Sequence, residues 1–200
     1  SVAVRAVDGR ILLLETADGT IRWTWRQQPL PALTLRQSAP MVFHEDVLYA
    51  GLPGARIAAL DLRLGAPRWE QQIATARGAT ELERLIDVAS EPVIHDGRVC
   101  AIAYQGRMAC LSENDGRVVW SRDVASGAGL SIGDGLVVTI DGSDRVLGLR
   151  YEGDELWRQD GYAWRAMTRP SVVGGYVASR SRPGRSSCAT SPITRRWVAA

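Results

Sequence analysis

The chain has 200 residues, of which 46% are hydrophobic and 23% are charged, and its formal net charge at pH 7 is +2. This composition excludes a disordered chain, because it holds enough apolar residues to offset the entropy of ordering. It also excludes a membrane-spanning helix, since no stretch approaches roughly 18 uncharged apolar residues. Three cysteines exclude a disulfide-rich scaffold, and the near-neutral charge argues against a dedicated nucleic-acid binder.

A repeated motif organises the chain. Gly-x-x-x-Trp occurs four times, and each copy follows an Arg-x-x-x-Leu motif whose arginine lies 12 or 13 residues before the tryptophan. The Gly-Trp pairs, in chain order, are Gly19 and Trp23, Gly65 and Trp69, Gly116 and Trp120, and Gly153 and Trp157. A large aromatic side chain at a fixed place in each unit is typical of packing between neighbouring sheets. We therefore interpret these tryptophans as structural repeat residues.

Each unit predicts four short strands joined by tight turns. Apolar and β-branched runs, such as residues 99–104 and 136–140, have strand length. Seven Asp-Gly dipeptides lie between the runs, and this pair favours tight hairpins because both residues tolerate a positive φ. Four strands in about 40–50 residues form one β-propeller blade. The sequence therefore predicts an all-β propeller of about four antiparallel blades.

One segment, residues 77–90, predicts a helix instead of strands. Thr80 and Glu83 have the spacing of a capping box, and Leu82, Leu85 and Ile86 would share one helical face. We expect this segment to be an insertion between two blades. Loops of this kind are where a rigid scaffold carries its functional residues.

The composition changes after residue 177. Residues 169–177 open a fifth unit, but residues 178–200 contain five arginines, no acidic residue and no alternation of polar and apolar side chains. We predict a partial propeller over residues 1–177 and an irregular basic tail over residues 178–200. Our hypothesis is that the tail is translated from a shifted reading frame, and a genuine disordered tail is the alternative.

Two segments add a resemblance to a known family. The repeat is similar to that of pyrroloquinoline-quinone (PQQ) enzymes and their non-enzymatic relatives. Residues 31–40 (PALTLRQSAP) and 77–88 (RGATELERLIDV) are more specific, and they resemble the family of the outer-membrane protein assembly factor BamB. The resemblance implies an eight-bladed propeller of which this chain is part. It also implies a non-catalytic scaffold, exported to the periplasm and lipid-anchored in the outer membrane.

The same resemblance implies partners and contact residues. The partners are the periplasmic domains of the barrel subunit BamA and other Bam complex subunits, with unfolded outer-membrane clients in addition. By motif match, Leu33, Leu35 and Arg36 lie on one interblade loop and Asp87 on a second, while Ala89 replaces an acid that is usual in the family. Two alternatives stay open from the residues alone. The leucines could be buried under the loop, and Arg36 could form a structural ion pair with Asp87.

No catalytic, cofactor or metal motif occurs in the sequence. His44 and His95 fall beside turns at equivalent places, without a cluster of further ligands, and there is no Gly-x-Ser-x-Gly elbow. We therefore expect no enzyme activity, no cofactor and no metal site. A PQQ-dependent quinoprotein dehydrogenase fragment is the alternative function, and a sensor domain of a larger signalling protein is a third.

The pairing of Cys100 and Cys110 depends on the turn between them. A two-residue loop would place the two side chains on opposite faces of the hairpin, and a three-residue loop would place them opposite each other. We interpret both residues as small buried thiols, with a cross-strand disulfide as the alternative.

Overall fold

The computed structural model describes residues 1–29, 34–35, 39–76, 78–80, 82–88, 90–181 and 188–192. Within these ranges the chain consists of strands and their connections, so the all-β prediction is confirmed. No helix in the described ranges is long and apolar enough to cross a membrane. The chain divides into two compact units, Ser1–Ala125 and Ser126–Ala200.

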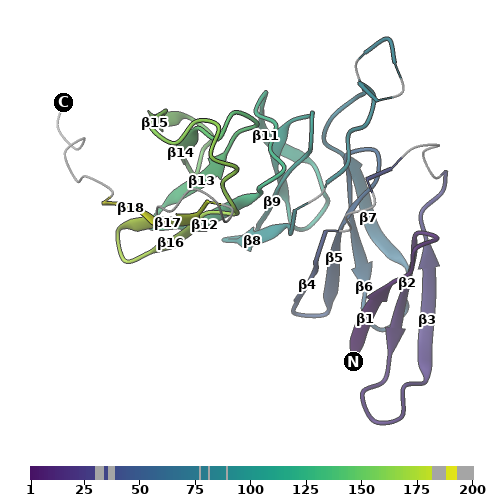
Figure 1. The fold of residues 1–200 in the computed structure, drawn as a ribbon. Coiled ribbons are helices and arrows are strands. Elements are labelled where there is room, and N and C mark those ends of the chain that lie inside the picture. The colour runs from purple at the N-terminus through teal and green to yellow at the C-terminus, as the bar shows by residue number, and fades with distance from the viewer. Residues whose placement is uncertain are drawn as a thin grey trace. The chain divides into compact units, whose positions relative to one another are not determined.

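The first unit contains three antiparallel sheets, and within each sheet the strands are neighbours in chain order (Figure 1). The first sheet comprises β1 (Val2–Arg5), β2 (Arg10–Leu14) and β3 (Ile21–Arg26). The second comprises β4 (Met41–His44), β5 (Val47–Leu52), β6 (Arg56–Asp61) and β7 (Pro67–Gln72). The third comprises β8 (Val93–His95), β9 (Arg98–Ile102), β10 (Met108–Ser112) and β11 (Val118–Arg122).

The second unit repeats this arrangement in two further sheets. One comprises β12 (Leu130–Gly133), β13 (Leu136–Ile140), β14 (Val146–Arg150) and β15 (Glu155–Gln159). The other comprises β16 (Ser171–Val173), β17 (Tyr176–Arg180) and β18 (Cys188–Pro192). The middle strands β13 and β14 are almost wholly buried, as β5, β6, β9 and β10 are in the first unit. Four-stranded meanders with buried central strands are the blades that the repeat predicts.

Two of the Asp-Gly pairs form the tight two-residue hairpins that were predicted. Asp96 and Gly97 connect β8 to β9 with φ angles of 44° and 69°, and the flanking residues His95 and Arg98 pair directly. A positive φ at both central positions is the signature of a type I′ turn, whose twist matches that of the strands. The same geometry recurs at residues 134–135, between β12 and β13.

The repeat tryptophans join consecutive sheets of the first unit. The indole Nε1–H of Trp23 donates to the Leu62 carbonyl at 2.9 Å, and that of Trp69 donates to the Glu113 carbonyl at 2.8 Å. Each ring also lies over the glycine of the Gly-x-x-x-Trp motif in the next sheet. A Cβ atom at Gly65 would stand 2.6 Å from the Trp23 ring, and one at Gly116 would stand 2.6 Å from the Trp69 ring. Glycine and tryptophan therefore recur together because one makes room for the other.

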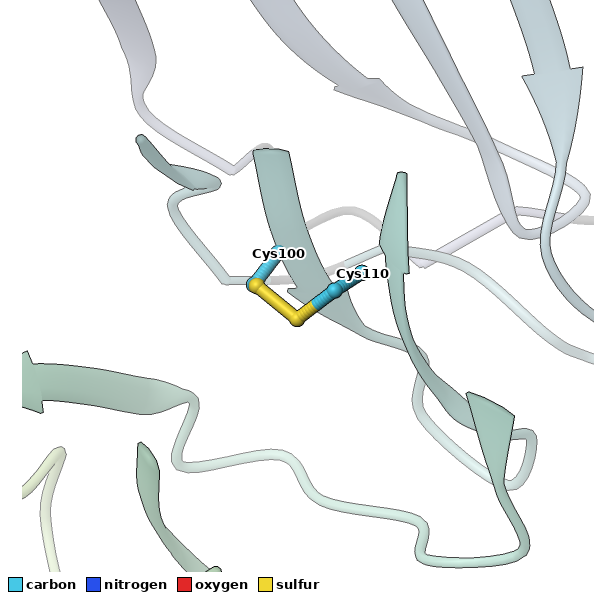
Figure 2. Close-up of a disulfide and its surroundings, with 2 residues drawn as sticks. All are labelled: Cys100 and Cys110. Atoms are coloured by element: carbon cyan, nitrogen blue, oxygen red, sulfur yellow. A yellow bond between two sulfur atoms is a disulfide. The ribbon is translucent and has the colours of Figure 1, made fainter. Parts of the chain in front are cut away.

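Cys100 and Cys110 form a disulfide, so the interpretation as free thiols is wrong (Figure 2). The Ala103 N–H donates to the Arg107 carbonyl at 2.9 Å, which leaves a three-residue loop between β9 and β10. The two cysteines then face each other in the register, with Cα atoms 4.0 Å apart and no exposed surface. Loop length, which decided between the two alternatives, could not be read from composition.

The helix predicted over residues 77–90 is wrong for the described part of that segment. The capping box does form, because Glu83 N–H donates to Thr80 Oγ1 at 3.2 Å and Thr80 N–H donates to Glu83 Oε2 at 3.1 Å. Only a single turn follows. Ile86 and Val88, which are 3% and 2% exposed, are buried in the core cluster of the second and third sheets. Burial of this extended segment outweighs its local helix propensity.

The described part of the C-terminal segment contains two paired strands, and the predicted boundary at residue 177 stays a prediction. β17 continues past residue 177 to Arg180, and it pairs over five residues with β18. Residues 182–187 and 193–200 lie outside the described residues. The reading-frame hypothesis stays a prediction.

Candidate partner-docking site

The two loops singled out by the sequence are joined in the structure. The backbone N–H of Leu35, on the connection between the first and second sheets, donates to Oδ2 of Asp87 at 2.5 Å. Asp87 lies on the connection between the second and third sheets, 52 positions further along the chain. Leu35 is half-buried. Leu33, Arg36 and Ala89 lie outside the described residues, so the Arg36–Asp87 ion pair stays a prediction.

Asp87 links three segments rather than two. Its Oδ1 accepts a hydrogen bond from the Gly54 N–H at 2.9 Å, in the turn between β5 and β6. Its backbone carbonyl accepts one from the Tyr104 N–H at 2.9 Å, in the turn between β9 and β10. The carboxylate is only 4% exposed, and hydrogen bonds to a charged acceptor are stronger than neutral ones. Asp87 therefore clamps the Leu35 loop to the turns of two sheets.

A second anchor, which the sequence analysis missed, holds the start of the same loop. The side chain of Gln27 is 2% exposed, and its Nε2–H donates to the Pro53 carbonyl at 3.1 Å. Pro53 and Gly54 are consecutive, so one turn of the second sheet receives both Gln27 and Asp87. A glutamine at the end of a strand carries no distinctive sequence signal. Its role becomes visible only when the turn it reaches is placed.

The inserted segment, residues 77–90, also carries an exposed apolar side chain five positions before Asp87. Leu82 is 72% exposed whereas Ile86 is 3% exposed, so the two residues do not share the one face that the helix prediction gave them. The turn that carries Leu82 is closed by local bonds, since Glu83 Oε2 also accepts from the Ala79 N–H at 2.7 Å. These backbone hydrogen bonds hold the pKa of the Glu83 carboxyl below its usual value. A single exposed leucine is common on protein surfaces, so Leu82 by itself does not mark a contact site.

The histidines have the surface positions expected of them. His44 and His95 each end the first strand of a sheet and are exposed. His44 Nε2 lies 3.5 Å from Glu113 Oε1, and that oxygen also accepts from the Tyr49 hydroxyl at 3.1 Å. Burial, together with the neighbouring Glu113, raises the pKa of Tyr49. Among the described residues no group of three or more metal-ligating side chains is arranged around a common point.

The comparisons with known proteins agree with this fold. A family model described as "Outer membrane protein assembly factor BamB" matches residues 1–152. BamB from Bordetella pertussis is 37% identical over 88% of this chain and 46% of its own length. BamB from Burkholderia pseudomallei is 34% identical, with the same shares of both chains covered. The chain thus spans about half the length of the curated relatives it matches.

Solved structures show the same likeness. The crystal structure of BamB from Moraxella catarrhalis has a TM-score of 0.83 and 25% identity, and covers 90% of this chain and 54% of that chain. A europium-containing methanol dehydrogenase has a TM-score of 0.59 and 11% identity, and covers 90% of this chain and 47% of that chain. The second likeness is one of fold alone, since one propeller fold serves unrelated functions.

Proposed function

Because the chain belongs to the family of the outer membrane protein assembly factor BamB, we propose that it is a non-catalytic scaffold of outer-membrane β-barrel assembly. In this role it binds the periplasmic domains of the barrel subunit BamA, and through them other subunits of the Bam complex. It thereby assists the insertion of barrel proteins into the outer membrane. Unfolded barrel chains are its clients.

The observation that supports this proposal best is the clamp at Asp87. A loop that must present Leu33, Leu35 and Arg36 to a partner gains affinity when its backbone is held in place beforehand. The hydrogen bond from the Leu35 N–H to a buried carboxylate provides that restraint. Apolar side chains beside an arginine are typical of interface residues that carry most of the binding energy. In this proposal the buried Asp87 fixes the backbone of the loop that forms the contact surface.

The proposed location is the periplasmic face of the outer membrane, with a lipid anchor, and the disulfide supports the part of this proposal that places the chain in an oxidising compartment. Disulfides persist in the bacterial periplasm and are rare in the cytosol, where thiols are kept reduced. The Cys100–Cys110 bond is fully buried in the third sheet. A chain that folds around such a bond matures best in an oxidising compartment.

The test is a charge reversal at the loop. Purified full-length protein carrying Arg36→Glu should lose capture of BamA periplasmic domains by at least about tenfold in Kd. Arg63→Glu is the matched control, because Arg63 is an exposed arginine on the turn between β6 and β7. Circular dichroism should be the same for both variants and the parent. Equal capture by all three proteins would remove the loop from the interface and refute the proposed docking site.

A further inference from the structure

The connection between β15 and β16 exposes an aromatic side chain. Trp164 is 77% exposed, whereas the other described tryptophans are buried or half-buried. Lone exposed apolar residues are common on protein surfaces, so this exposure marks a site only together with the way the backbone around it is held. We call residues 160–166 the Trp164 loop, and all of them belong to the second unit.

The backbone of the Trp164 loop has a conformation that does not suit its side chains. Trp164 and Ala166 have φ angles of 64° and 53°, in the left-handed region that glycine adopts freely and that residues with a Cβ atom rarely adopt. A sequence that served only the fold would gain stability from glycine at these positions. A bulky side chain in this region is a marked departure, and departures of this kind are typical of functional sites.

Hydrogen bonds from one turn hold this conformation in place. Asp144, in the turn between β13 and β14, accepts from the N–H groups of Ala166 and Met167 at 2.7 and 2.8 Å. The neighbouring Ser143 carbonyl accepts from the Trp164 N–H at 3.2 Å. Met167, which is 7% exposed, belongs to a buried cluster of this unit and fixes the end of the loop. The indole is thus presented on a backbone that is restrained before a partner binds, which favours affinity.

The side chains of the loop are of the types that protein interfaces favour. Besides Trp164 it carries Tyr162 and Arg165, and the guanidinium carbon of Arg165 lies 5.8 Å from the centre of the Tyr162 ring, within the range of a cation–π contact. Tryptophan, tyrosine and arginine are enriched among the interface residues that carry most of the binding energy. Asp160 offsets the charge of Arg165, so the loop lacks the excess positive charge that attracts anionic lipids or nucleic acid.

The Leu35 loop is built in the same way. There the carboxylate of Asp87 joins the connection between two sheets to Gly54, in the turn between the second and third strands of a sheet. At the Trp164 loop, Asp144 makes the same link from that turn itself. In both places a carboxylate restrains the backbone of a connection between sheets, and this equivalence is the reason for committing to one partner at both loops.

We propose that the Trp164 loop is a second docking element, whose indole enters an apolar pocket on the periplasmic domains of BamA. The proposal rests on the proposed function, from which it takes the partner, and it adds a contact in a part of the chain that no motif marks. The two loops fail separately. Unchanged BamA affinity in Trp164→Gly would remove only the Trp164 loop, and unchanged affinity in Arg36→Glu would remove only the Leu35 loop.

The test measures the affinity of full-length protein for purified BamA periplasmic domains by surface plasmon resonance, together with unfolding in urea. Trp164→Gly removes the indole and suits the backbone conformation. We expect it to weaken BamA affinity by at least about tenfold, while its urea midpoint stays at or above that of the parent. Glu45→Gly is the matched control, because Glu45 is exposed with a φ of 51° in the turn between β4 and β5, and it should bind like the parent.

Four results would overturn the proposal. They are parent-like BamA affinity in Trp164→Gly, a lowered urea midpoint in that variant, equal weakening in Glu45→Gly, and no binding of BamA by the parent, which would refute the proposed function too. Vesicles of phosphatidylethanolamine and phosphatidylglycerol test a lipid surface instead. A shift of the parent's tryptophan emission on these vesicles that is absent in Trp164→Gly would assign the loop to the membrane and overturn the proposal as well.

Discussion

Gly116→Ala tests the packing of the repeat. Gly116 has a φ of 71°, a conformation that costs a residue with a Cβ atom about 1–2 kcal/mol. The new Cβ would also stand 2.6 Å from two atoms of the Trp69 ring. Trp69 is 9% exposed and donates to the Glu113 carbonyl, so the ring cannot move away without losing contacts on both sides.

The expected loss follows from three contributions. The backbone conformation costs about 1–2 kcal/mol, overpacking of a well-packed site typically costs about 1–3 kcal/mol, and the indole hydrogen bond contributes about 1 kcal/mol. Gly116→Ala should therefore lower the free energy of unfolding by about 3–6 kcal/mol. Gly97→Ala is the control, because its φ is 69° but its Cβ would meet nothing within 4 Å. It should cost only about 1–2 kcal/mol.

Urea unfolding of the full-length variants, followed by tryptophan fluorescence, measures both losses. The difference between the two variants isolates the contact with Trp69, since the backbone cost is common to both. If Gly116→Ala is no more destabilising than Gly97→Ala, the pairing of glycine with the preceding tryptophan does not hold the sheets together, and this reasoning is refuted.

Three further predictions follow from the same contacts. Reduction of the Cys100–Cys110 bond with dithiothreitol, or the substitution Cys110→Ala, should lower the free energy of unfolding by about 2–4 kcal/mol in urea titrations. An unfolding midpoint of the parent protein that does not change with reductant would contradict this prediction. Asp87→Ala should weaken the capture of BamA, measured by surface plasmon resonance, and Asp87→Asn should weaken it less because the amide keeps one acceptor oxygen. Equal losses of BamA affinity in the two variants would argue against the clamp. Burial raises the pKa of Asp141, but hydrogen bonds from Arg145 outweigh it and hold that pKa below its usual value, so its stabilisation is present above about pH 4 and is lost as pH falls further. The stability difference between the parent and Asp141→Asn should therefore shrink between pH 7 and pH 3, and a constant difference would show that the pair contributes nothing.

The blade architecture could be predicted from the sequence because the motifs that specify it are local and repeated. Asp96–Gly97 and Asp134–Gly135 specify their own hairpins, and the spacing of glycine and tryptophan records the contact between sheets. The helix over residues 77–90 was mispredicted for the opposite reason. Thr80 and Glu83 do make the capping box, but Ile86 and Val88 are buried between two sheets, and that distant contact leaves no local pattern.

The candidate site was predictable in part. The motif match pointed to Leu35 and Asp87, and the structure brings them into direct contact. It did not show that Asp87 is buried against backbone donors, because a carboxylate on a loop is more often solvated. The role of Gln27 depends on the placement of the turn at Pro53, which a single sequence does not reveal.

Site-specific photo-crosslinking at position 35 tests the central claim most directly. A photoreactive phenylalanine analogue would replace Leu35 in the full-length protein in living cells, with Leu64, which is 65% exposed on another turn, as the control position. The account predicts an adduct with BamA from position 35 and none from position 64. No adduct at position 35, or equal adducts at both positions, would contradict a docking surface on this loop.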